Sequence, residues 1–139
     1  MTEGSAMSDL QTITDLLYSP GEPMTGSTMT DDQALAFARE YCRYTEFCLV
    51  RDWLWIDLSV TEVQRLELEK TRRQPVIVYA HSVIYDSARR WDVGDVVRTS
   101  PLSVFEEGFL FRTLNSTYVL LGDGQRKRAA LETVGRIRF

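Results

Sequence analysis

The sequence lacks the features that usually reveal a chemical activity. Its 139 residues include one histidine, His81, and two cysteines, Cys42 and Cys48. These residues do not occur at the spacing of a metal site. No glycine-rich turn ends in Lys-Ser or Lys-Thr, as a phosphate-binding loop would. We therefore predict no metal, no cofactor, no catalytic residues and no enzymatic activity.

Long apolar runs are also absent. No run approaches the roughly 18 residues that a membrane-spanning helix requires, and the polar, acidic start, Met1–Ser8, does not resemble a secretory signal. Two cysteines cannot form a disulfide framework, so reduced thiols are expected. These observations predict a cytoplasmic protein that has no membrane partner.

The composition is that of an ordinary globular protein, with 44% hydrophobic and 26% charged residues, and the length suits one domain. The net charge of −4 is unevenly distributed. Residues 1–88 carry 7 basic and 14 acidic side chains, a balance of −7, whereas residues 89–139 carry 9 and 6, a balance of +3. This asymmetry either steers the molecule toward a charged partner or reflects two solvated faces.

Capping signals predict two N-terminal helices. Ser8 and Gln11 form a possible capping box that would start the first helix, which leaves residues 1–7 disordered. Residues 19–29 are rich in proline and glycine and are predicted to be a mobile loop. Thr30 and Gln33 form a second capping box, which predicts the most secure helix of the chain.

A third helix is predicted at residues 61–72, started by Ser59 or Thr61 and ended before Pro75. Phe47–Leu58 alternates with a period of two and carries apolar residues on both faces, apart from Asp52, so it is predicted to be a covered strand. Further strands are predicted at Pro75–Tyr85, Val96–Ser100, Phe109–Leu114, Thr117–Leu121, Gln125–Leu131 and Thr133–Phe139.

Two turns are predicted to connect the last strands as hairpins, at Asn115-Ser116 and at Gly122-Asp123-Gly124. The glycine turn is followed by a strand rather than a helix, so it is not expected to bind phosphate. Together the elements predict a single α+β domain. Two or three N-terminal helices pack on a strongly bent antiparallel sheet, and its C-terminal strands can close into a small barrel.

His81 is the one residue from which a catalytic site could be built, but no partner lies at a suitable spacing. On a strand, His81 and Ser82 point to opposite faces. We therefore interpret His81 as structural.

Two groups of residues are candidates for binding a partner. The first group is basic and consists of Arg126, Lys127, Arg128, Arg136 and Arg138. Such charges can contact phosphates, or they can protect an edge strand from aggregation. The second group is Trp53 and Trp55, which share a strand face and form either an interface or the floor of the core.

The C-terminal segment resembles an uncharacterised family of small bacteriophage and prophage proteins over residues 91–128. The strings DVGDVVRTS at 92–100 and LFRTLNSTYVLLGDGQRK at 110–127 carry this resemblance. It implies an accessory protein that acts inside a bacterial host cell, and it transfers no functional residues. We expect a non-enzymatic protein that binds a host or defence protein. A nucleic-acid-binding accessory protein is the alternative, and a cryptic enzyme comes third.

Overall fold

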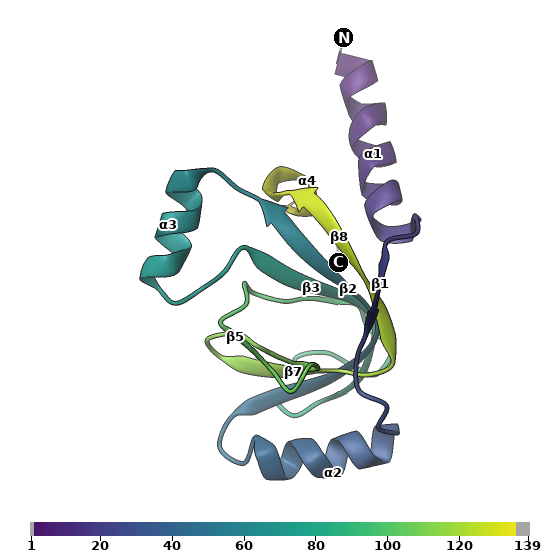
Figure 1. Cartoon of the computed structure of the whole chain (residues 1–139). Coiled ribbons are helices and arrows are strands. Elements are labelled where there is room, and N and C mark those ends of the chain that lie inside the picture. The colour runs from purple at the N-terminus through teal and green to yellow at the C-terminus, as the bar shows by residue number, and fades with distance from the viewer. Residues whose placement is uncertain (1, 136–139) are drawn as a thin grey trace.

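The computed structural model describes residues 2–135, and the side chains of residues 10–135. It is a mixed α+β structure with four helices and one sheet, which curls into a half-barrel (Figure 1). The elements in order are α1 (Thr2–Tyr18), β1 (Glu22–Thr25), α2 (Asp31–Tyr41), β2 (Glu46–Ser59), α3 (Glu62–Lys70), β3 (Val76–Asp86), β4 (Val97–Arg98), β5 (Val104–Glu106), β6 (Leu110–Arg112), β7 (Ser116–Leu120), β8 (Asp123–Ala130) and α4 (Leu131–Gly135).

The long strand β2 lies at the centre of the sheet, in agreement with its apolar residues on both faces. On one side it pairs with β3, which runs antiparallel and pairs in turn with β4. On the other side it pairs first with β7 and then with β8, and both run parallel to it. Strand β1 extends the sheet from β8, and β6 and β5 extend it from β7. The sheet is therefore mixed, which corrects the prediction of an antiparallel sheet.

The predicted hairpin at Gly122 is wrong. Because β8 continues in the direction of β7, both strands pair in parallel with β2. The chain does not reverse there: Val50 pairs with Leu120, and Leu54 pairs with Gln125. Four steps along β2 thus correspond to five along β7 and β8, which is the signature of a bulge. Gly122 has a φ of 69°, and Asp52, which lies between the paired residues Val50 and Leu54, has a φ of 53°. Asp52, the exception in the predicted alternation, is the residue at which β2 changes partners.

The hairpin between β6 and β7 is confirmed, with Leu110 opposite Val119 and Arg112 opposite Thr117. The C-terminus differs from the prediction, because α4 (Leu131–Gly135) covers the start of the last predicted strand, Thr133–Phe139. The remainder of that expected strand, residues 136–139, lies outside the described residues. Strand β5 was not predicted.

Local capping signals predicted the internal helices well. Capping boxes start α2, at Thr30 and Gln33, and α3, at Thr61 and Gln64. In contrast, α1 begins at Thr2, so residues 2–7 are helical and Ser8 is not the N-cap. Residues 19–29 contain an edge strand, β1, where only a loop was predicted. Whether that segment is mobile stays a prediction.

Three apolar clusters cover the sheet. The largest lies inside the curl and contains both Trp53 and Trp55. The second packs beneath α1 and α4 through Leu16 and Val134, and the third packs beneath α2 through Ala34 and Ala38. Helix α3 contributes no buried residue and projects beyond the sheet from the β2–β3 connection (Figure 1). The prediction that a third helix packs on the sheet is therefore wrong.

Candidate functional site

The two tryptophans proposed as a partner surface lie in the core. Trp53 and Trp55 are both buried. The Trp53 indole donates a hydrogen bond to the carbonyl of Leu121 at 3.1 Å, and the Trp55 ring meets Phe105 and Phe111 edge-on. The shared strand face was predicted correctly, and the core interpretation holds. These side chains are not available as a binding surface.

The basic stretch on β8 is used largely within the fold. The Arg126 guanidinium forms two hydrogen bonds with the Asp57 carboxylate, at 2.6 and 3.1 Å, and these bonds raise the pKa of Arg126. The same guanidinium lies 5.8 Å from the centre of the Trp55 ring. Because Asp57 neutralises it, Arg126 offers little free charge to a phosphate.

Lys127 holds the C-terminal end of α1. Its ammonium group donates hydrogen bonds to the carbonyl of Leu16 at 2.5 Å and to that of Ser19. Lysine often satisfies the last carbonyls of a helix in this way and complements the negative end of the helix dipole. Burial lowers the pKa of Lys127.

Arg128 is exposed and forms no ion pair within the described part of the chain. Arg136 and Arg138 lie outside the described residues. Of the five basic residues predicted to form a contact surface, the structure therefore shows only Arg128 with a charge that remains open to a partner.

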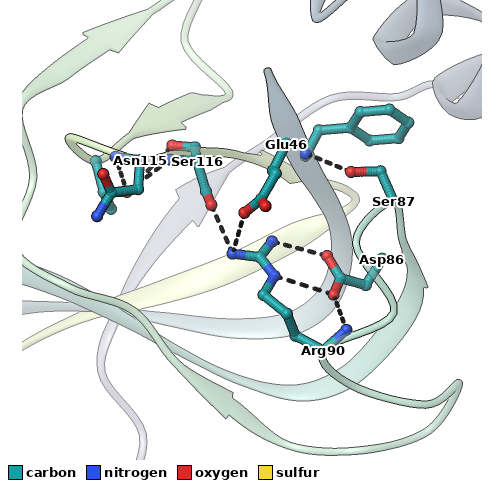
Figure 2. Close-up of polar contacts among 8 residues, drawn as sticks. Glu46, Asp86, Ser87, Arg90, Asn115 and Ser116 are labelled. Atoms are coloured by element: carbon teal, nitrogen blue, oxygen red, sulfur yellow. Dashed lines mark hydrogen bonds and ion pairs between the residues drawn. The ribbon is translucent and has the colours of Figure 1, made fainter. Parts of the chain in front are cut away.

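A conspicuous polar network joins the loop after β3 to the first residues of β2 and β7 (Figure 2). The Asp86 side chain has no exposed surface, and the Arg90 guanidinium binds both of its oxygens, at 2.7 and 3.1 Å. Arg90 also donates to the Ser116 hydroxyl at 2.6 Å and pairs with Glu46 at 3.3 Å. Burial favours the neutral guanidinium, but the hydrogen bonds and charge of Asp86, together with Tyr118 and Glu46, outweigh burial and raise the pKa of Arg90.

The polar groups of this network bind one another, which leaves little capacity for a ligand. The Arg90 guanidinium lies 4.6 Å from the Trp91 ring centre, and the backbone N–H of Arg90 donates to Asp86 at 2.6 Å. Nearby, burial raises the pKa of Cys48 and of Tyr118, each to about 12. The thiol and the phenol therefore stay protonated at neutral pH and provide no nucleophile. We interpret the network as a structural clasp.

His81 lies on β3 beside the end of α1. Its ring centre is 4.9 Å from that of Tyr79 and 5.8 Å from that of Tyr18. Burial lowers the pKa of the imidazole despite the opposing effect of the nearby Asp52 carboxylate. Ser82, on the opposite face, does not share its cavity. Within residues 2–135 no group of three or more histidine, cysteine or acidic side chains is placed to hold a metal ion.

An apolar pair is exposed on the connection between β2 and β3, residues 60–75, which we call the α3 arm. Val63 and Leu66 are one helical turn apart and are 69% and 45% exposed. Arg65 pairs with Glu62 and Glu69, and Lys70 pairs with Glu67 at 3.1 Å. The sequence predicted this helix but not its exposure, because the charged residues around Val63 and Leu66 are equally compatible with the rim of a packed helix.

The site geometry therefore defines an α+β protein with a curled mixed sheet, an internal clasp and an exposed helical arm. The chain belongs to the family described as a domain of unknown function, DUF6957, whose profile matches residues 25–136. The expected membership of an uncharacterised family is thus confirmed, over a longer segment than residues 91–128. The match does not indicate a phage origin. No curated protein and no solved structure matches the chain. No helix in the described part is long and apolar enough to cross a membrane.

Proposed function

We propose that this protein is a non-enzymatic binding protein that contacts a protein partner through the α3 arm. The observation that carries the proposal is the complete lack of buried residues in α3, together with the exposed pair Val63 and Leu66. Exposed apolar side chains that occur singly need no explanation. Here two of them lie one turn apart on a helix that has no buried side chain.

The energetics of so short a helix support this proposal. Helices of fewer than about 12 residues are marginal in water unless tertiary packing stabilises them, and α3 has nine. Its capping box and ion pairs supply local stabilisation, of about 1 kcal/mol for the cap and a few tenths for each pair. Complete burial of a valine or leucine side chain contributes about 1.5–3 kcal/mol. Burial of Val63 and Leu66 by a partner would therefore stabilise α3 more than its capping box and ion pairs do.

The charges of the arm indicate the chemistry of that partner. The three glutamates of α3 are already paired with Arg65 and Lys70. Beyond the helix, Arg73 donates a hydrogen bond to the Thr71 hydroxyl at 2.7 Å, and the side chain of Arg72 has no partner in the described part. The charge that lacks an acidic partner just after α3 is thus positive. A protein with an apolar groove and an acidic rim would complement it, as grooves that receive amphipathic helices do.

The biological setting belongs to the same proposal. The resemblance of residues 92–100 and 110–127 to phage and prophage proteins supports a partner among host or defence proteins, in the cytoplasm of a bacterial cell. The alternative, nucleic-acid binding through β8, is weakened because Asp57 neutralises Arg126 and the end of α1 engages Lys127.

The test starts with a photoreactive amino acid at position 63 of the full chain, expressed in bacteria, with position 93 as the control. We expect a discrete crosslinked protein at 63 that survives nuclease treatment and is absent at 93. A band that nuclease removes would favour the nucleic-acid alternative. No adduct at 63 above the level at 93 contradicts the proposal.

Purified components then provide the quantitative test. The arm variant Val63→Glu/Leu66→Glu is compared with Val93→Glu/Val104→Glu, in which two apolar residues of similar exposure, 77% and 46%, receive the same charges. We expect the captured protein to bind the arm variant at least about tenfold more weakly, a loss of about 1.4 kcal/mol. The control variant should bind as the wild type does. Equal losses in both variants would contradict a contact through α3.

A further inference from the structure

The chain contains two pairs of adjacent arginines, Arg72-Arg73 at the end of the α3 arm and Arg89-Arg90 after β3. In each pair the first arginine is exposed and has a positive φ, of 60° at Arg72 and 55° at Arg89. Residues other than glycine seldom adopt such angles. The two pairs therefore share sequence, exposure and backbone strain, and they differ in what holds them in place.

The second pair is fixed by the clasp. The Arg90 guanidinium binds both oxygens of the buried Asp86 carboxylate, and the backbone N–H of Arg90 donates to the same carboxylate at 2.6 Å (Figure 2). Separating the two side chains would leave a buried charge without its partner, which is strongly unfavourable. The loop that carries Arg89 and Arg90 therefore opens rarely.

The first pair closes only the end of a helix. The N–H of Arg72 donates to the carbonyl of Glu69 at 3.0 Å, and that of Arg73 donates to the carbonyl of Leu68 at 2.9 Å. These two bonds form a Schellman motif, in which glycine usually occupies the position of Arg72. Because no residue of α3 is buried, the motif can open without exposing any core. Segments of this kind unfold locally at low free energy.

Within this pair, the peptide bond between Arg72 and Arg73 is the more accessible one. The next bond is tied to the body of the protein, because the N–H of Gln74 donates to the carbonyl of Leu102 at 2.8 Å and the Gln74 side chain donates to the carbonyl of Ser103 at 3.3 Å. The Arg72 side chain has no partner in the described part of the chain. It is therefore free to enter the pocket of another protein.

We propose that the bond between Arg72 and Arg73 is a site of limited proteolysis by an endopeptidase whose specificity pocket carries a carboxylate. A carboxylate binds an arginine guanidinium through paired hydrogen bonds, and such a pocket selects the residue before the cleaved bond. Hydrolysis consumes one water. Its oxygen joins the carbonyl carbon of Arg72 as the C–N bond breaks, and both of its protons end on the Arg73 nitrogen, which leaves a carboxylate and an ammonium group.

The cut would change the arm and leave the sheet intact. Residues 73–139 supply β3, β7 and β8, which pair with β2 on both sides, so the two fragments stay associated. In α3 the cut removes the hydrogen bond from Arg73 to Leu68 and places a carboxylate near the negative end of the helix dipole. Both changes destabilise α3. Cleavage would thus switch the arm off, a consequence that rests on the proposed function, whereas the cleavage itself does not.

Limited digestion of the full native protein with trypsin tests the site, with intact masses measured over time. Trypsin cleaves after lysine as well as arginine, so Lys70 on the same helix and Arg89 after β3 compete with Arg72. We expect the first cut within residues 2–135 to follow Arg72, and its two fragments to elute together in size-exclusion chromatography. A first cut elsewhere in that range, or fragments that separate, would overturn the proposal.

Two variants of equal net charge separate the site from general electrostatics. Arg72→Gln is compared with Arg89→Gln, which removes the same charge at another exposed position of positive φ. The first cut should slow at least about tenfold in Arg72→Gln and less than about twofold in Arg89→Gln, because cleavage follows the population of the locally open form. Similar slowing in both variants would contradict a preferred site at Arg72.

The purified nicked protein distinguishes the cleavage from the function of the arm. Hydrogen–deuterium exchange should accelerate at residues 62–70 and stay unchanged in β2 and β3. The protein captured through position 63 should bind the nicked form at least about tenfold more weakly than the intact form. Equal binding of the two forms would refute the switch. Failure of the intact chain to crosslink at position 63 would instead count against the α3 arm, and the digestion result would stand on its own.

Discussion

Replacement of Arg90 by methionine tests whether the clasp after β3 is structural. The substitution keeps a long aliphatic side chain but removes the guanidinium from the Asp86 carboxylate, which has no exposed surface. Breaking a buried ion pair by removing one partner costs about 3–5 kcal/mol, because the other charge stays buried without compensation. Two features place the expected loss at the lower end, about 3 kcal/mol. Arg90 is 28% exposed, and its backbone N–H continues to donate to Asp86.

The matched control is Arg43→Met. Arg43 pairs with Glu40 at 2.7 Å, but both side chains are exposed, at 57% and 78%. Exposed pairs contribute about 0.2–1 kcal/mol. The free energy of unfolding is measured by urea denaturation, followed by circular dichroism, because Trp91 contacts Arg90 and its fluorescence would respond directly to the substitution.

The double variant Asp86→Asn/Arg90→Met sharpens the test. It removes the buried charge as well as its partner, so the two losses should not add. We expect a coupling energy of at least about 1 kcal/mol between the two positions. If Arg90→Met destabilises the protein no more than Arg43→Met does, the network is not a clasp, and Arg90 would then be a candidate for binding an anion.

Three further predictions concern other parts of the molecule. Lys127→Met should accelerate amide exchange in α1 while leaving the sheet protected, because the ammonium no longer holds the helix end; hydrogen–deuterium exchange checks this. Gly124→Ala should lower the free energy of unfolding by about 1–3 kcal/mol in urea, since the added Cβ would overlap the Trp53 indole, whereas Gly135→Ala meets no neighbour within 4 Å and should be neutral. Burial lowers the pKa of His81, so stability should decrease as the pH falls from about 6.5 through the folded-state pKa, and His81→Gln should lack this decrease in thermal unfolding.

The elements that the sequence predicted correctly are those specified by neighbouring residues. The capping boxes at Thr30 and Thr61 depend on side chains three positions apart, and both are present in the structure. The long strand β2 was predicted because alternation is a local pattern. Gly122 was misinterpreted because a hairpin turn and a bulge both require positive φ. Only pairing with a distant strand distinguishes them.

The internal contacts of the basic residues on β8 could not be predicted from the sequence, for a related reason. A cluster of basic residues in the sequence does not reveal which of them form hydrogen bonds or ion pairs inside the fold. Lys127 reaches carbonyls more than 100 positions away, and the partner of Arg126 lies 69 positions away. The pairing of Asp86 with Arg90 spans only four positions, and opposite charges at that spacing were the one local signal that could have indicated the clasp.

Charged side chains that already have partners inside the fold are poor candidates for a binding site. Arg90, Arg126 and Lys127 each have partners inside the fold, so removing any of them should affect stability before it affects binding. Among the charged groups without such partners in the described part, Arg128 lies exposed on β8 and Arg72 lies on the arm, where the chain leaves the sheet. Loss of binding without loss of stability is therefore the result that would distinguish a functional residue from a structural one in this protein.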